Sequence, residues 1–176
     1  GHQDFSEDTY RALLAVDSVV MVLDAAKGVE PQTLKLFEVC RGHGLPVLTF
    51  INKLDQPARD PFELLDQIER VLGISAAPMN WPLGDGPHYR GVYDLEADTV
   101  LFYERQQRGR RMEPVAVAAP TDPVVEELVG AERQRALIEA VEIITGAGTR
   151  FDPDAYRAAK QTPVFFGSAL NDFGVQ

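Results

Sequence analysis

Asn52, Lys53 and Asp55 form the pattern Asn-Lys-x-Asp directly after the apolar run 47–51. These side chains suit the recognition of a guanine base, which presents a ring N–H and an exocyclic amine side by side. The carboxylate of Asp55 can accept from both donors, whereas adenine offers no such pair. A bidentate contact discriminates against the wrong base by about 1–3 kcal/mol in the analogous case of DNA readout. In this interpretation the amide of Asn52 pins the loop and the apolar stem of Lys53 lies across the base.

A second polar turn, Gly167-Ser168-Ala169-Leu170, follows another apolar run near the end of the chain. The backbone N–H of Ala169 would donate to the guanine carbonyl, in a turn that Ser168 supports, and Leu170 belongs to the same predicted binding turn. Asn, Asp and Ser after a strand are also ordinary turn and capping residues, and for either motif alone that alternative stays open. The two motifs together, each at the end of a predicted strand, favour a guanine site.

Three apolar segments predict the strands that must position these turns. They lie near residues 18–24, 46–51 and 163–168. The first is rich in β-branched residues and is predicted to be buried on both faces. Helices are predicted from caps, prolines and apolar spacing over about 6–16, 31–44, 61–73 and 152–160. Alternating strands and helices imply an α/β fold with a parallel sheet, whose ligands bind beyond the carboxyl ends of the strands.

The middle of the chain has a different pattern. Residues 77–150 contain short alternating runs rich in Gly, Pro and aromatic residues, which predict antiparallel hairpins, and then two helices. We therefore predict an α+β subdomain, 77–150, inserted into an α/β domain formed by 1–76 and 151–176. The basic segment Arg105–Arg111 could contact RNA or be a solvated hairpin tip, and the second interpretation is favoured.

The composition limits the function. The 176 residues include 27 acidic and 17 basic side chains, and the net charge of −10 argues against broad binding of nucleic acid, DNA included. Cys40 is the one cysteine, which fits a cytoplasmic setting and a place in the core. No apolar run approaches the roughly 20 residues that span a membrane. His43 and His88 have no neighbours at metal-ligand spacing, so no metal site is assigned.

Three motifs occur in an order that resembles the second half of the GTP-binding domain of translational GTPases. They are Gly-His-x-Asp-Phe at 1–5, Asn-Lys-Leu-Asp at 52–55 and Gly-Ser-Ala-Leu at 167–170. Three longer segments are more specific, namely "GHQDFSEDTYRALLAVDSVVMVLDAAKGVE", "NWPLGDGPHYRGVYDLE" and "TPVFFGSALNDFGV". They resemble the bacterial class-II peptide chain release factors, and the resemblance covers nearly all of the chain.

The resemblance implies part of a Ras-like P-loop NTPase domain in a ribosome-dependent GTPase that recycles class-I release factors. It implies binding of GTP or GDP with Mg²⁺, and partners in the ribosomal stalk protein and ribosomal RNA. It further implies that His2 orients the attacking water. Guanine would be held by Asn52, Lys53, Asp55, Ser168, Ala169 and Leu170. The alternatives are an elongation factor G-type or ribosomal-protection GTPase, or a docking module that binds no nucleotide.

The sequence lacks the motif that would bind the phosphates of a nucleotide, which limits what these residues can do alone. It contains no Gly-Lys pair and so no Walker-type phosphate loop, and the resemblance places that loop and the magnesium-binding Thr upstream. We therefore expect these residues alone to be inactive and to bind no nucleotide tightly. The resemblance also implies that three strands of a six-stranded sheet remain. The strand at 18–24 would be an edge beside an uncovered face, with Val19, Val20, Met21 and Val22, and we expect self-association through it.

Overall fold

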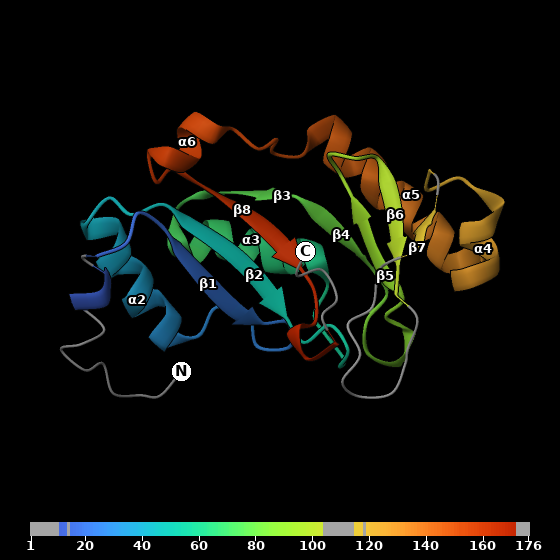
Figure 1. The fold of residues 1–176 in the computed structure, drawn as a ribbon, viewed down its shortest axis with the longest axis horizontal. Helices are drawn as coiled ribbons and strands as arrows, with labels where there is room; N and C mark the ends of the chain where they lie inside the picture. Colours follow the sequence, from blue (N-terminus) through green and yellow to red (C-terminus); the bar gives the residue numbers. More distant parts are fainter. Residues whose placement is uncertain (1–10, 14, 104–114, 118, 172–176) are drawn as a thin grey trace.

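The structure, a computed structural model, describes residues 11–13, 15–103, 115–117 and 119–171. This part contains two four-stranded sheets, one parallel and one antiparallel, which lie toward opposite ends of the molecule (Figure 1). The α/β class predicted from the sequence is confirmed. No helix in these ranges is both long enough and apolar enough to cross a membrane.

The parallel sheet has the strand order β1-β2-β8-β3. Its strands are β1 (Val19–Asp24), β2 (Val47–Asn52), β8 (Gln161–Phe166) and β3 (Ser75–Pro78). The first three are the strands that the sequence predicts. β3 is a fourth strand, so the expected number of three is wrong. The sequence does not predict β3 because Ser-Ala-Ala-Pro lacks the β-branched and aromatic residues that indicate a strand. It pairs with β8 and spans residue 77, where the sequence places a domain boundary.

β1 differs from the strand buried on both faces that the sequence predicts. Met21 and Leu23 lie in the core, with exposed fractions of 9% and 2%, whereas Val20 and Val22 on the other face are 62% and 56% exposed. Within the described ranges β1 pairs with β2 alone, so it is an edge of the sheet. The expectation of an uncovered face is therefore confirmed for Val20 and Val22 and is wrong for Met21.

Two helices cover the buried face of the parallel sheet. They are α2 (Pro31–Gly42) and α3 (Pro61–Leu72), and each begins with a proline, whose missing N–H is not needed in the first turn. Asp60 caps α3 at two backbone N–H groups, and Gly73 ends it at a φ of 66°, a conformation that favours glycine. Cys40 of α2 is 2% exposed and burial raises the pKa of its thiol, which supports the predicted place in the core.

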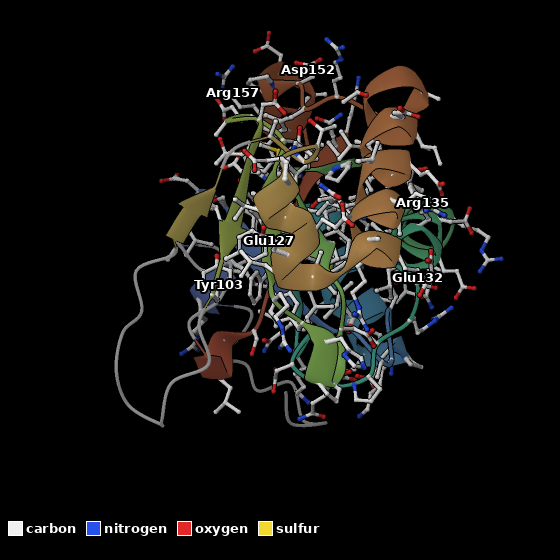
Figure 2. The ribbon with its side chains drawn as sticks, turned by 90° about the vertical axis from the view of Figure 1, so that its right-hand side faces the viewer. Tyr103, Glu127, Glu132, Arg135, Asp152 and Arg157 are labelled. Carbon is white, nitrogen blue, oxygen red and sulfur yellow. The ribbon has the colours of Figure 1, made fainter. Side chains whose placement is uncertain are left out.

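The antiparallel sheet forms from the predicted hairpins, in the order β4-β5-β6-β7. Its strands are β4 (Asn80–Leu83), β5 (Gly91–Asp94), β6 (Thr99–Phe102) and β7 (Val115–Val117). Helices α4 (Pro123–Val129) and α5 (Ala131–Ala147) follow and lie at the end of the molecule away from α2 (Figure 1). They present charged side chains outward, among them Glu127, Glu132 and Arg135 (Figure 2).

The remaining predicted segments have different outcomes. Helix α6 (Pro153–Arg157) leads back to β8 and is shorter than the predicted 152–160. Of the helix predicted over 6–16, residues 11–13 are helical and most of the rest lies outside the described residues. The basic segment Arg105–Arg111 also lies outside them.

Asn80 joins the two sheets at the end of β8. Its Nδ2 donates to the backbone oxygen of Phe166 (3.1 Å), and its Oδ1 accepts from the backbone N–H of Phe166 (2.7 Å). The side-chain amide thus takes the place of a backbone peptide and extends the pairing to β8 beyond β3. The ring centroid of Trp81 lies 4.5 Å from that of Phe62 and 5.6 Å from that of Phe166, so the core continues from one sheet into the other.

Candidate functional site

The carboxyl ends of β2 and β8 bring the two predicted binding loops together. Ile51 of β2 lies opposite Phe166 of β8, so the residues that follow each strand emerge side by side. The backbone N–H of Gly167 donates to the oxygen of Ile51 (2.9 Å), and the N–H of Leu54 donates to the oxygen of Gly167 (3.2 Å). Parallel pairing therefore continues into the loops and fixes their separation.

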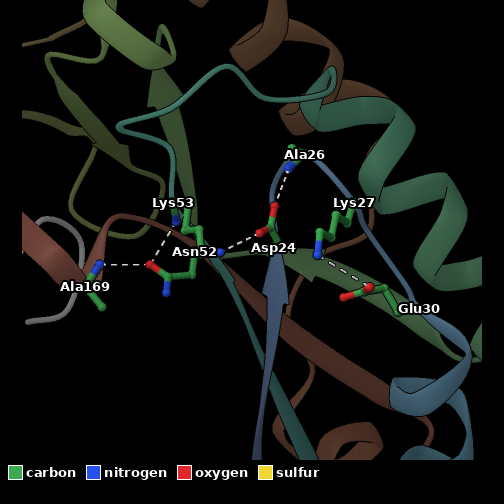
Figure 3. A network of polar contacts seen from close by, with 7 residues as sticks. All are labelled: Asp24, Ala26, Lys27, Glu30, Asn52, Lys53 and Ala169. Atoms are coloured by element: carbon green, nitrogen blue, oxygen red, sulfur yellow. Dashed lines mark hydrogen bonds and ion pairs between the residues drawn. The ribbon is translucent and has the colours of Figure 1, made fainter. Parts of the chain in front are cut away.

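Asn52 ties these loops to each other through one side-chain oxygen. Its Oδ1 accepts from the backbone N–H of Lys53 (2.8 Å) and from the backbone N–H of Ala169 (2.9 Å) (Figure 3). The two donors belong to different loops and are separated by more than a hundred residues in the chain. A single amide therefore sets the shape of both turns.

Asp55 and Ser168 form a second link between the same loops. The hydroxyl of Ser168 donates to Oδ1 of Asp55 at 2.6 Å, and Ser168 has no exposed surface. A buried hydroxyl on one carboxylate oxygen fixes the orientation of the whole carboxylate. The group that could accept from two adjacent donors of a base is therefore held in place before any ligand arrives.

Lys53 adopts a left-handed conformation, with a φ of 72°, which is uncommon for a residue other than glycine. Its Nζ contacts Oδ2 of Asp24 at 2.7 Å (Figure 3). This hydrogen bond lowers the pKa of the Asp24 carboxyl and raises the pKa of the Lys53 ammonium. The lysine is thus held toward β1, at one side of the two loops.

Asp24 is a contact that sequence reasoning missed. It ends β1 directly opposite Asn52, the last residue of β2, and the N–H of Ala25 donates to the oxygen of Asn52 at 2.9 Å. The sequence contains a usable signal, because a carboxylate at the end of one parallel strand lies beside polar residues at the end of the next.

The turn at the end of β8 differs in part from expectation. The N–H of Ala169, which the sequence assigns to the guanine carbonyl, donates to Asn52 instead, so a base would have to share or replace that contact. Leu170, in the short helix η2 (Ala169–Asn171), is 78% exposed. His2 lies outside the described residues.

The loop after β2 is supported from the other side by the segment after β4, which sequence reasoning also missed. The N–H of Gly86 donates to the backbone oxygens of Leu54 (2.8 Å) and Gln56 (3.1 Å). Oδ2 of Asp85 accepts from the N–H of Ala58 at 2.8 Å. Gly86 begins the short helix η1 (Gly86–His88) at a φ of 53°. The loop of Lys53 and Asp55 is therefore held between β8 and η1.

Comparison with known proteins identifies relatives of the entire chain. Proteins named Peptide chain release factor 3 from Gloeobacter violaceus, Symbiobacterium thermophilum and Nitrosomonas europaea are 52%, 49% and 50% identical over 176, 176 and 177 residues. Each alignment covers all of this chain and 33% of the relative, so the chain spans a third of the length of these relatives. The resemblance to peptide chain release factors is thereby confirmed.

The family model agrees with the arrangement of the loops. Its description is "Elongation factor Tu GTP binding domain", and it matches residues 1–176. A parallel sheet whose strand ends present Asn52, Asp55 and Ser168 to one place is consistent with that match. The chain therefore belongs to the elongation factor Tu GTP-binding domain family.

Proposed function

We propose that these residues are the guanine-recognition part of a ribosome-dependent GTPase of translation termination. The observation that carries the proposal is the linked pair of loops, in which Ser168 orients Asp55 and Asn52 holds Ala169. The relatives named as release factors support the assignment to termination over an elongation factor G-type protein. In this proposal the full-length protein hydrolyses GTP and recycles class-I release factors in the cytoplasm.

Each site residue has a role that follows from its chemistry. The carboxylate of Asp55 accepts from the ring N–H and exocyclic amine of guanine, and Ser168 holds it in the required orientation. The stem of Lys53 covers one face of the base, and Asn52 keeps the two loops together. The N–H of Ala169, which donates to Asn52 in this structure, is shared with the guanine carbonyl when a base is bound, and Leu170, exposed beside it, borders the site.

The phosphates and Mg²⁺ would depend on residues other than these, since the 176 residues contain no Gly-Lys pair. Base contacts alone contribute about 2–4 kcal/mol by analogy with DNA readout. That free energy corresponds to a dissociation constant of about a millimolar or weaker. We therefore propose that this chain alone is inactive, and that His2 acts on the attacking water only within the full-length protein.

Fluorescence titration with labelled GDP, with ADP as the control ligand, tests the base-recognition proposal. We expect the full-length protein that contains these residues to bind GDP and not ADP, and the 176-residue chain to show no saturation at high micromolar protein. Tight GDP binding by the chain alone would contradict the weak-binding proposal. A full-length protein that binds ribosomes but neither nucleotide would indicate a docking module instead.

A second measurement addresses the partners. Residues 77–150 contain the antiparallel sheet with α4 and α5, and we propose that this insertion faces the ribosome, with the stalk protein and ribosomal RNA as partners. Release of a labelled class-I factor from terminated ribosomes should require both GTP and the full-length protein. Release that proceeds equally without GTP would contradict the recycling role.

A further inference from the structure

Asp24 is held by contacts on both of its carboxylate oxygens. Oδ1 accepts from the backbone N–H of Ala26 at 2.9 Å, and the backbone oxygen of Asp24 accepts from the N–H groups of Lys27 and Gly28 at 3.0 and 2.8 Å. The turn after β1 thus fixes the carboxylate, and its other oxygen, Oδ2, accepts from Nζ of Lys53. The side chain of Asp24 is 17% exposed, against 52% for Lys53.

Lys53 is therefore held both at its backbone and at the tip of its side chain. At the backbone, its N–H donates to Asn52 in a left-handed conformation that costs free energy for a residue with a side chain. At the tip, the ammonium is bound by a carboxylate that a different strand positions. A lysine stem has four rotatable bonds and loses considerable conformational entropy when it is ordered. A contact at the ammonium that orders the stem in advance therefore reduces the entropy that ligand binding must still remove.

The other acidic groups near Lys53 are arranged differently. Glu30 and Asp55 also raise the pKa of the ammonium, but only through charge, whereas Asp24 does so first through a hydrogen bond. Glu30 pairs with Lys27 at 3.8 Å, and Asp55 accepts from Ser168. Asp24 is thus the carboxylate whose contact decides where the stem of Lys53 lies.

We propose that Asp24 is a positioning residue for guanine nucleotides, which holds the stem of Lys53 extended over the base. The inference rests on the proposed function, because it needs a base between the two loops. Asp24 contacts the nucleotide only through Lys53. Its loss therefore weakens the binding of every guanine nucleotide without changing the preference for guanine over adenine, which belongs to Asp55.

The variant Asp24→Asn separates this role from a role in folding. Asparagine keeps the oxygen that accepts from Ala26 and so preserves the turn, but it presents an amide without charge to Lys53. Asp94→Asn is a matched control, because Asp94 ends β5 and its Oδ1 accepts from the N–H groups of Glu96 and Ala97 in a similar turn. Lys53→Met keeps an apolar stem and removes the ammonium.

The experiment measures GDP dissociation constants for the full-length protein with Asp24→Asn, Lys53→Met, both changes, or Asp94→Asn. We expect Asp24→Asn to weaken GDP binding about two- to five-fold, the range that partly exposed ion pairs give. In the Lys53→Met background the same change should have no effect, and Asp94→Asn should bind GDP like the unmodified protein. The pKa of the Asp24 carboxyl, measured by NMR, should rise in Lys53→Met.

The outcomes distinguish this inference from the function on which it rests. Unmodified protein that binds no GDP would overturn the proposed function and the inference with it. GDP binding that Asp24→Asn leaves unchanged, or that it weakens equally with and without the ammonium of Lys53, would overturn the inference alone. An Asp24 pKa that does not respond to Lys53→Met would do the same.

Discussion

In the proposed function, the carboxylate of Asp55 is the group that distinguishes guanine from other bases. Replacement by asparagine keeps one acceptor and adds one donor, which no longer matches the two adjacent donors of guanine. It does match xanthine, which carries a carbonyl in place of the exocyclic amine. For Asp55→Asn in the full-length protein we expect GDP affinity to fall by about 1–3 kcal/mol and affinity for xanthosine diphosphate to rise.

Competition between the two nucleotides measures this switch. Asp66→Asn is a suitable control, because Asp66 is an exposed carboxylate on α3 outside both binding loops. A variant that loses GDP without gaining xanthosine diphosphate would show that Asp55 acts on the loop and does not read the base.

The Asp24–Lys53 pair also predicts that the free energy of unfolding depends on pH. Its pKa in the folded chain is lowered by the hydrogen bond from Lys53, so its contribution is complete above the ordinary value of 3.8 and is lost as the pH falls through the lower folded value. The pKa of Lys53 is raised above 10.5, so the same contact is lost again as the pH rises through that higher value.

Urea unfolding at several pH values checks this expectation. The difference in free energy of unfolding between the unmodified chain and Asp24→Asn should be largest near neutral pH and should shrink below about pH 4 and above about pH 10.5. A difference that stays constant from pH 3 to pH 7 would mean that the Asp24–Lys53 pair does not form in solution.

Sequence patterns reveal residues that act near their own strand and miss those that act across strands. Asn52, Asp55 and Ser168 each follow an apolar run, so their common location is predictable from parallel topology alone. Asp24 and Gly86 act on the same loop from β1 and η1. Their contribution depends on strand register and loop path, which the spacing of residues does not determine.

At the scale of the elements, the hairpin β5-β6 leaves no room for a Cβ atom at Gly91. A Cβ atom at this position would lie 2.0 Å from the backbone oxygen of Leu101, which cannot move without breaking the pairing of the two strands. We expect Gly91→Ala to lower the free energy of unfolding by about 1–3 kcal/mol, the usual cost of overpacking.

Gly146→Ala is the matched control, measured by the same urea titration. Gly146 lies in α5, and beyond the backbone of its own helix no atom of the described residues comes within 4 Å of the place that a Cβ would take. Alanine there should leave stability unchanged or raise it by up to about 1 kcal/mol. Equal effects of the two substitutions would contradict the steric argument.

From the exposed edge strand β1 we predict that the 176-residue chain self-associates. Val20 and Val22 are more than half exposed, and a groove of about 650 Å³ runs between β1 and α2. An unpaired strand edge with an apolar face invites pairing with a second copy of the same strand. We therefore expect the chain to form dimers or larger species as its concentration rises, and Val20→Lys to suppress them.

Sedimentation velocity over a range of concentrations measures this association. Val124→Lys is the control, because Val124 is 41% exposed and belongs to α4, which lies at the opposite end of the molecule from β1 (Figure 1). A monomer at all concentrations, or equal suppression by both lysine variants, would contradict association through β1.

The sequence predicts helices and strands correctly where apolar periodicity is strong. It fails where contacts with neighbouring elements determine whether a strand forms or which face is buried. α3 has a capping Asp60, a first-turn proline and a terminal Gly73, and each signal is local. β3 has small residues and exists because β8 offers it an edge. The exposure of Val20 and Val22 likewise depends on which elements lie beside β1, a property that an apolar run does not encode.

At the scale of the whole molecule, Asn80 connects the antiparallel sheet to the loops of the candidate site. Its amide holds both the N–H and the oxygen of Phe166, and Phe166 directly precedes the turn that contains Ser168 and Ala169. Gly86 of η1 holds the other loop, because its N–H donates to the backbone oxygens of Leu54 and Gln56. Both loops are therefore supported by residues 80–86, so the proposed insertion is part of the architecture of the site.

This coupling predicts that Asn80→Ala affects both stability and binding. The substitution leaves the buried N–H and oxygen of Phe166 without their partner, at a cost of about 2–4 kcal/mol in the free energy of unfolding. Because the end of β8 is then less restrained, GDP binding by the full-length protein should weaken as well. Thr49→Val is the control, since it removes a buried hydrogen bond to Thr162 (2.8 Å) from the same sheet.

Urea unfolding and GDP titration of both variants decide whether the sheets are coupled. Thr162 belongs to the beginning of β8 and Phe166 to its end, so the two variants loosen opposite ends of one strand. We expect both to lose stability, but only Asn80→Ala to lose GDP affinity at temperatures where each protein remains folded. Equal losses of affinity would mean that GDP binding follows the stability of the sheet as a whole, and that Asn80 has no particular role in holding the loop of Ser168.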